Sequence, residues 1–302
     1  MEPGDVRTVT SGECTDLYYV DTGMYDTAEY GSVYVLDAER PAIVDTGIGT
    51  NYERILAALD EAGIERDDLE VIAITHVHLD HAGGAGFIAD ACPNAEVYVH
   101  ESGARHLADP SRLWKGTKSA VGDQIEFYTE PEPVPDSRIT ELEDGDTIDL
   151  GDHELVVHHA PGHAPHQVVF EDPANDAVFT ADAAGIWVPS ISQITETSPP
   201  PQFDLEGTLA DAEMLVAMDP ETLLFAHFGP KDADGVLAEY TDVLTDWVQA
   251  VERKREELGD DEAVIDHFVE NADMGHVWGE RKARGETAMN VRGVLTYLDH
   301  GE

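Results

Sequence analysis

The sequence predicts an α/β protein in which two stacked sheets are covered by helices on their outer faces. Two observations lead to this expectation. Short runs rich in β-branched residues alternate with helical patterns along the first part of the chain, and from Asp204 onward the pattern becomes mainly helical. The chain has 302 residues, of which 42% are hydrophobic, so it can bury the core of one large domain with an appendage or of two domains.

The predicted elements of the first part follow one another closely. We expect strands at 32–37, 41–47, 71–75 and 96–100, and helices at 51–63, 82–91 and 101–108. The strands at 32–37 and 41–47 are expected to pair. The helix at 51–63 has the clearest pattern, because Ile55, Leu56 and Leu59 recur at helical spacing on one face.

The second part begins with strands and ends with helices. We expect strands at 146–151, 153–160, 166–172, 176–182 and 221–230, and helices at 205–218 and 233–258, followed by two shorter helices that end near Leu298. The strand at 221–230 is apolar along most of its length, which indicates a buried position. No internal repeat is visible, and a strand-rich half followed by a mixed half again indicates two stacked sheets with helices outside.

The charge balance is extreme, because 63 acidic residues against 17 basic ones give a formal net charge of −46. Such a surface repels itself in dilute buffer, whereas at 1 M salt the Debye length falls to about 3 Å and the repulsion is screened. The composition favours a protein of a salt-rich, halophilic cytoplasm, with a merely acidic mesophilic protein as the alternative. It also disfavours nucleic acid as a partner, without excluding it at high salt.

Cysteine content and apolar patterning indicate the compartment. Cys14 and Cys92 are too few for a disulfide framework and are expected to fill space as small apolar residues. The N-terminal segment lacks the basic start and long apolar stretch of a secretory signal, and no run predicts a membrane span. We therefore expect a cytoplasmic protein with no membrane partner.

The segment THVHLDHAGG at 75–84 places three histidines and an aspartate within six positions, directly after the apolar run VIAI. His76 and His78 stand two residues apart, so on an extended segment both imidazoles project to the same side and can bind one ion. Asp80 and His81 follow where the chain turns into a helix, which directs them toward a second point nearby. The spacing predicts a metal site, with a solvated polar loop as the alternative.

Three further candidate ligands lie at or near the ends of predicted strands. His163 follows a Pro-Gly turn in HHAPGHAPH, Asp182 ends the strand in VFTADAAG, and His227 ends the strand in LLFAHFGP. A single strand-end histidine is commonly an ordinary polar residue. Together, however, the three would complete two metal sites that share one bridging carboxylate.

This set of motifs resembles the metallo-β-lactamase superfamily of dinuclear hydrolases. The resemblance extends over roughly residues 15–230 and depends on HxHxDH, followed in order by PGH, a strand-end aspartate and a strand-end histidine. It implies a four-layer αβ/βα sandwich with the site at one edge. It also implies a catalytic domain at 1–230 and a helical C-terminal extension at 231–302 that packs on it.

The resemblance also implies a role for each residue of the set. The expected ligands are His76, His78 and His163 for the first ion, Asp80, His81 and His227 for the second, and Asp182 as the bridge between them. Asp45 in IVDTG matches an early aspartate that orients the site, and Asp80 and Asp45 are expected to serve catalysis. All ligands are nitrogen or oxygen donors, which favours two Zn²⁺ ions and leaves Fe²⁺ or Mn²⁺ open.

Retention of Asp80 together with His227 is similar to the glyoxalase II and ribonuclease Z branches, whereas usual β-lactamases have cysteine in place of Asp182. The resemblance implies hydrolysis of a small ester or thioester by a hydroxide that bridges the two ions. It also implies that the helical part after Asp204 builds a substrate-binding wall. A ribonuclease Z-like phosphodiesterase is the first alternative, and a metal-binding or redox module without hydrolytic turnover is the second.

Residues 110–140 are expected to form a long excursion over the surface, because EPEPVPDSR is rich in proline and acid. The aromatic residues Trp114, Phe127 and Tyr128 within it need somewhere to bury. Two interpretations follow from this need. The excursion is a lid over the metal site, or it packs onto the protein's own surface or onto the partner of a homodimer.

Other polar clusters have a functional and a structural interpretation. His166 in PGHAPHQ either contacts substrate or, as we favour, makes a local hydrogen bond. His158 and His159 face opposite ways on a strand and are expected to be structural. The basic clusters at 253–255 and 281–284 are expected to form ion pairs on helix surfaces rather than to bind an anionic group.

Overall fold

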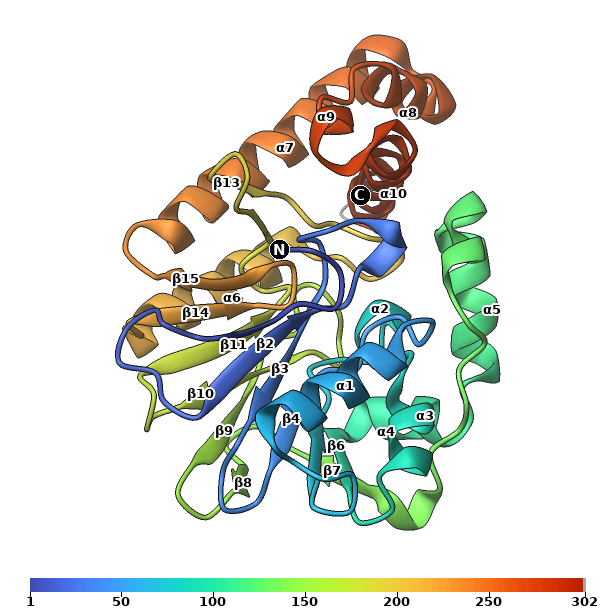
Figure 1. The fold of residues 1–302 in the computed structure, drawn as a ribbon. Coiled ribbons are helices and arrows are strands. Elements are labelled where there is room, and N and C mark those ends of the chain that lie inside the picture. Colours follow the sequence, from blue (N-terminus) through green and yellow to red (C-terminus); the bar gives the residue numbers. More distant parts are fainter. Residues whose placement is uncertain (301–302) are drawn as a thin grey trace.

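The computed structural model describes residues 1–300 and contains two sheets that face each other, with helices on both outer sides (Figure 1). Three hydrophobic clusters fill the spaces between the layers. In β3 (Ser32–Leu36), Val33 and Val35 belong to the cluster beneath the first helical layer, whereas Tyr34 and Leu36 belong to the cluster between the sheets. This alternation follows from the two-residue period of a strand and confirms the predicted αβ/βα sandwich.

The first sheet has seven strands in the order β1 to β7. Besides β3 they are β1 (Val6–Thr8), β2 (Leu17–Asp21), β4 (Ala42–Val44), β5 (Val71–Ala73), β6 (Glu96–His100) and β7 (Ile139–Leu142). Pairing is antiparallel from β1 to β4 and parallel from β4 to β7. The parallel part needs crossover helices, which are α1 (Tyr52–Ala62), α2 (Leu79–Ala82), α3 (Ala85–Ala91) and α4 (Glu101–Ala108).

The second sheet has six strands in the order β15-β14-β11-β10-β9-β8. Their bounds are β8 (Thr147–Asp149), β9 (Glu154–His159), β10 (Val168–Asp172), β11 (Ala177–Ala181), β14 (Thr222–Phe225) and β15 (Gly229–Asp232). A separate hairpin consists of β12 (Ile186–Val188) and β13 (Gln193–Thr195). Only β11 and β14 are parallel, and the helix α6 (Leu205–Met218) lies in the connection between them.

The remaining helices form the C-terminal region, drawn in orange to red in Figure 1. They are α7 (Val236–Leu258), α8 (Asp261–Glu270), α9 (Gly275–Trp278) and α10 (Glu280–His300). Buried residues of α6, α7, α8 and α10 share one hydrophobic cluster with β11 and β14. The helical end of the chain therefore covers the second sheet, and the predicted division into domains at residue 230 stays a prediction.

Several elements differ from the sequence-based expectation. The helix expected at 82–91 is split into α2 and α3 by Gly83 and Gly84, whose backbones lie so close to Thr46 and Ile48 that a Cβ would come within 3 Å of their carbonyl groups. The strand expected at 221–230 is the hairpin β14–β15, because the chain turns at His227. After α7 the described residues form α8, α9 and the 21-residue α10, where two shorter helices that end near Leu298 were expected.

The excursion at 110–140 contains regular structure. Its first part is the helix α5 (Ser111–Ala120), drawn in green at the side of the molecule in Figure 1, followed by the 3₁₀ helix η2 (Gly122–Phe127). A second 3₁₀ turn, η3 (Asp136–Arg138), leads into the edge strand β7. Within residues 1–300, no helix is both long and apolar enough to cross a membrane, and both cysteines are free.

Candidate metal centre

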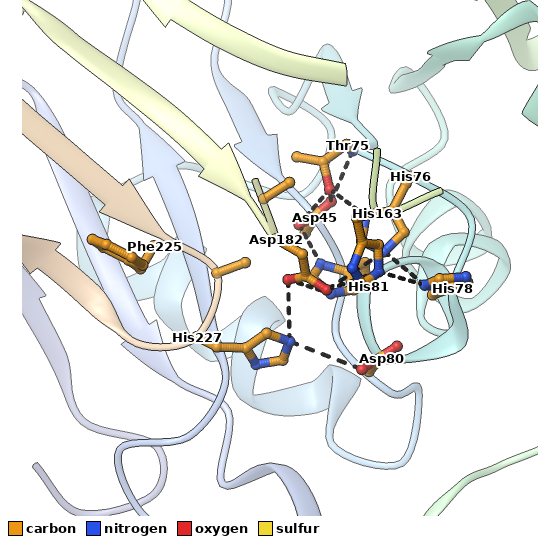
Figure 2. A network of polar contacts seen from close by, with 12 residues as sticks. Asp45, Thr75, His76, His78, Asp80, His81, His163, Asp182, Phe225 and His227 are labelled. Atoms are coloured by element: carbon orange, nitrogen blue, oxygen red, sulfur yellow. Dashed lines mark hydrogen bonds and ion pairs between the residues drawn. The ribbon is translucent and has the colours of Figure 1, made fainter. Parts of the chain in front are cut away.

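The candidate ligands come together at one edge of the two sheets (Figure 2). They come from segments that follow strands. The segments that hold them are the extended segment after β5 with the adjoining α2, the loop after β9, the residue directly after β11, and the turn between β14 and β15. Figure 2 shows the seven labelled side chains directed toward a common centre: His76, His78, Asp80, His81, His163, Asp182 and His227.

Three imidazoles form the first group of ligands. The Nδ1 atom of His78 lies 3.0 Å from His76 Nε2 and 3.1 Å from His163 Nε2. His76 is fully buried and His163 is 2% exposed. Three ring nitrogens that converge at this spacing offer three lone pairs to one cation, the arrangement that zinc-type sites use.

Asp80, His81 and His227 form the second group, in which the ligand atoms lie within 4.8 Å of one another. The Nε2 atom of His227 is 3.9 Å from Asp80 Oδ2. The Asp80 side chain is 24% exposed, against 2% for His81 and 4% for His227. Asp80 is therefore the ligand of this group that faces solvent.

Asp182 lies between the two groups. Its Oδ2 atom is 3.1 Å from His163 Nε2 and 4.0 Å from His76 Nε2, whereas its Oδ1 atom is 3.5 Å from His81 Nε2 and 3.6 Å from His227 Nε2. Each carboxylate oxygen thus faces a different group. The register of β11 shifts between Phe179 and Ala181, and such a bulge changes the direction of the side chains that follow.

The unused nitrogens of two ligands are held by hydrogen bonds. His227 Nδ1 lies 3.0 Å from the Tyr30 carbonyl oxygen, and His81 Nδ1 lies 2.9 Å from Asp45 Oδ2. Because a carbonyl or carboxylate oxygen only accepts, each Nδ1 carries the proton and each Nε2 lone pair is left to face the centre. Asp45 itself accepts from the backbone N–H and the hydroxyl of Thr75.

Unsatisfied polar atoms test whether these residues fit divalent ions. Buried atoms without a hydrogen-bond partner include His81 Nε2 and Asp182 Oδ1, both of which point at the centre. Burial lowers the pKa of His163 to about 3, which keeps its imidazole neutral. Burial opposes ionisation of Asp182, but the surrounding histidines His163, His81 and His227 outweigh it and hold the pKa of that carboxyl below its usual range. A neutral His163 imidazole beside an ionised Asp182 carboxylate offers donors that fit a divalent cation.

A family model described as the metallo-β-lactamase superfamily matches residues 26–227, about two thirds of the chain. The chain belongs to the metallo-β-lactamase superfamily. Proteins of this fold typically bind divalent metals and are generally hydrolases. The histidine and aspartate groups just described are present in the structure, and the identity of the metal stays a prediction.

Relatives within the superfamily differ in how much of the chain they match. A metallo-β-lactamase fold-containing protein of Sulfurisphaera tokodaii is 26% identical over 290 residues, which are 93% of this chain and 97% of that protein. The acyl-coenzyme A thioesterase MBLAC2 of Gallus gallus is 28% identical over 183 residues, which are 55% of this chain and 62% of the thioesterase.

Two solved superfamily structures show the same fold. The crystal structure of an archaeal superfamily protein from Sulfolobus tokodaii has a TM-score of 0.73 at 23% identity and covers 93% of this chain and 99% of that chain. A subclass B3 metallo-β-lactamase of Bradyrhizobium japonicum has a TM-score of 0.61 at 20% identity, with 85% and 97% covered.

The loop that presents His163 in this superfamily site is held by α6. Gly162 N–H donates to Asp211 Oδ2 at 2.7 Å, and the Gly162 carbonyl accepts from Asp204 N–H at 2.9 Å. A Cβ on Gly162 would lie 2.0 Å from the backbone nitrogen of Thr208. The glycine of the PGH motif is therefore required by the close approach of two backbones.

A narrow cavity of about 70 Å³ opens beside the ligands. The excursion reaches it: Thr117 and Ala120 of α5, together with Val121 and Tyr128, form part of the wall. Phe127 and Tyr128 also join a hydrophobic cluster at this end of the molecule. The excursion thus borders the candidate site, whereas its action as a lid stays a prediction.

Sequence reasoning missed several residues of this wall. Tyr25 and Tyr30 come from the loop before β3, and Glu286 and Met289 come from α10. Lys282 belongs to a basic cluster for which surface ion pairing was expected. The cluster does form ion pairs, but Lys282 is buried, at 5% exposure, and pairs with Glu286, which lines the cavity. The only sign of Lys282 in the sequence is that it is one of few cations. Which of the cations in the cluster is buried depends on how α10 packs against the rest of the protein.

The other histidines of the motifs make local contacts. His166 Nδ1 accepts the Val77 N–H at 3.4 Å, and burial lowers the pKa of His166 to about 2. His158 Nε2 lies 2.8 Å from Glu171, and His159 Nε2 lies 3.0 Å from the Pro165 carbonyl oxygen. These contacts agree with the structural interpretation of all three residues.

Proposed function

We propose that the protein is a dinuclear metal-dependent hydrolase of a small ester or thioester, as the glyoxalase II resemblance implies. One observation carries the proposal. The two carboxylate oxygens of Asp182 face separate groups of ligands, which is the geometry that a bridged pair of ions needs. Intact donor groups on both sides also disfavour a metal-binding or redox module without turnover.

Each ligand has a defined part in this proposal. The first ion would be held by His76, His78 and His163, the second by Asp80, His81 and His227, with Asp182 shared between them. Divalent ions bound there, Zn²⁺ by preference for this donor set, would supply an activated water and polarise the substrate carbonyl. Asp45 and the Tyr30 carbonyl orient the two imidazoles that they touch. Asp80, open to the cavity, can take a proton on its carboxylate and release it to solvent.

The walls of the cavity support a carbonyl substrate over a nucleic acid. Among the described residues that line it, none is lysine or arginine, and the negative groups Asp80 and Glu286 face inward. A phosphodiester brings one charge per phosphate and normally meets basic side chains. A small acyl group brings little charge and needs only a walled pocket beside the metals. The thioesterase name of one relative supports the same choice.

A comparison of substrates tests the proposal. Initial rates would be measured at high salt, with added Zn²⁺ or Mn²⁺, on an S-acyl thiol, an aryl ester, bis-nitrophenyl phosphate and a 3′-extended tRNA. We expect the carbonyl substrates to be fastest and the activity to be lost in His76→Ala. Site-specific RNA cleavage that His76→Ala abolishes, without thioesterase activity, would instead establish the ribonuclease Z-like alternative.

A further inference from the structure

The helix α10 places a carboxylate in the wall of the cavity, outside the region that the family model matches. Glu286 lines the cavity together with Asp80, Asp182 and His227, and it is 5% exposed. The family model ends at residue 227, and α10 begins at Glu280. Glu286 belongs to none of the candidate metal-binding groups of the described residues. Its position therefore needs an explanation other than metal ligation.

Lys282 forms an ion pair with Glu286 and does not itself line the cavity. Its Nζ atom lies 3.9 Å from the Tyr25 ring centre and 4.2 Å from the Tyr30 ring centre. The ammonium group thus contacts two aromatic rings and the Glu286 carboxylate, and these three side chains, rather than Lys282, line the cavity.

The Glu286 carboxylate has acceptor capacity left for a ligand. An ionised carboxylate offers about four lone-pair positions. Lys282 donates to one oxygen of the carboxylate. Burial, and after it the neighbouring Glu286 carboxylate to which the Tyr30 phenol donates, raise the pKa of that phenol. These two donors come from the protein side. The remaining positions are available to a group that enters the cavity.

Stability alone is a weak reason for this ion pair. Replacing a buried ion pair by apolar residues of similar volume is often neutral or stabilising. The helix is already anchored by the buried side chains of Ala283, Val291, Val294 and Leu295. A charged pair at the cavity wall is better explained by what the cavity binds.

We propose that Glu286 is a specificity-determining residue that accepts a hydrogen bond from a hydroxyl or amide N–H on the acyl part of the substrate. This assignment rests on the proposed hydrolysis of an ester or thioester. Because Glu286 lines the same small cavity as Asp80, Asp182 and His227, an acyl group bound in that cavity would lie near Glu286. Acyl groups that bear a donor are selected over plain acyl groups of the same length, and an anionic acyl group is disfavoured.

Pairs of thioesters that differ by one hydroxyl test this assignment. The pairs are 2-hydroxypropionyl against propionyl and 3-hydroxybutyryl against butyryl, on one common thiol, with N-acetylglycyl against pentanoyl for the amide. The variant Lys282→Met/Glu286→Met removes the pair without leaving a buried unpaired charge. Lys254→Met/Glu257→Met is the matched control, because it removes an exposed helical ion pair and leaves the same net charge.

We expect the wild type and the control to prefer the donor-bearing member of at least one pair by about tenfold to a hundredfold in kcat/KM, as for a hydrogen bond to a charged group. The Lys282→Met/Glu286→Met variant should lose this preference, measured as the ratio of kcat/KM within each pair on one enzyme preparation, so that any change of the absolute rate common to both members cancels. Glu286→Gln keeps an acceptor and should retain part of the preference. An unchanged preference in Lys282→Met/Glu286→Met would show that the pair is only structural.

A binding measurement separates this assignment from the proposed function. If the metal-loaded wild type hydrolyses no thioester or ester, the proposed function is wrong, and calorimetric binding of 2-hydroxypropionate, propionate, 3-hydroxybutyrate and butyrate then decides about Glu286. Tighter binding of the hydroxy acid that disappears in Lys282→Met/Glu286→Met supports the donor site. The same affinity difference in wild type and variant overturns it.

Discussion

Gly162→Ala is the substitution whose effect can be worked out most directly from the structure. Gly162 precedes the candidate ligand His163, and its backbone lies against the start of α6. An added Cβ would lie 2.0 Å from Thr208 N, 2.3 Å from the carbonyl carbon of Gly207 and 2.4 Å from Thr208 Cα. All three are backbone atoms, so the clash cannot be relieved by turning a side chain.

The expected loss of stability has two parts. Overpacking against rigid neighbours typically costs about 1–3 kcal/mol. Moving the loop to relieve the clash would also weaken the 2.7 Å bond from Gly162 N–H to Asp211, and a hydrogen bond to a charged group contributes about 1.5–3 kcal/mol. We therefore expect Gly162→Ala to lower the free energy of unfolding by about 3–5 kcal/mol and to displace His163 from the first ligand group.

Two other glycines provide a graded control. A Cβ on Gly207 would lie 3.0 Å from the Cα of Gly162, a milder contact, and a Cβ on Gly116 in α5 would meet nothing within 4 Å. Urea unfolding at high salt should rank the losses as Gly162→Ala, then Gly207→Ala, with Gly116→Ala neutral or stabilising because alanine is the better helix former. Chelator competition should show weaker metal binding for Gly162→Ala. Equal stability of all three variants would refute the close contact between the loop and α6.

Three further predictions concern metal, salt and pH. Elemental analysis of the folded wild type should give two ions per chain, and fewer than one ion per chain would contradict the dinuclear site. Asp45→Asn should weaken the binding of metal about 10- to 100-fold, because His81 loses its carboxylate partner. At a net charge of −46 the melting temperature should fall when KCl is reduced from above about 1 M to 50 mM, and an unchanged melting temperature would contradict the halophilic interpretation. Burial raises the pKa of Asp211 to about 6, above the usual 3.8, so the folded state binds a proton more tightly than the unfolded state. The stability of the wild type relative to Asp211→Asn should therefore fall as the pH rises from about 4 to 6. Urea unfolding measures this difference, and the absence of a fall would show that the pKa of the carboxyl is not raised.

The candidate metal ligands could be predicted from the sequence because they lie in short continuous motifs that resemble those of a known family. His76 and His78 project together from an extended segment, and Asp182 follows a strand whose neighbours position it. The residues that orient them are a different case. His227 is held by the backbone carbonyl of Tyr30, and every residue has such a carbonyl, so the sequence does not single it out. Thr75, which donates to Asp45, looks like any other threonine at the end of a strand. Contacts through backbone atoms become visible only when the strands are assembled.

Some of the features that sequence reasoning missed have no clear period in the sequence. The edge strand β1 is three residues long and mostly exposed, so its pattern does not alternate. The split between α2 and α3 depends on how closely the backbone at Thr46 approaches Gly84. Both features depend on tertiary contacts, and short-range patterns do not contain them.

The ion pair between Lys282 and Glu286 shows how composition can single out a residue that short-range patterns do not reveal. At spacing i, i+4 the two residues look like any exposed helical ion pair. Yet the chain has only 17 basic residues against 63 acidic ones, and Lys282 is 5% exposed. In a protein whose surface carries so few cations, a lysine held between Tyr25 and Tyr30 contributes nothing to the balance of surface charge. Its position is instead explained by its contact with Glu286, and the substrate contact that we propose for Glu286 would explain the pair.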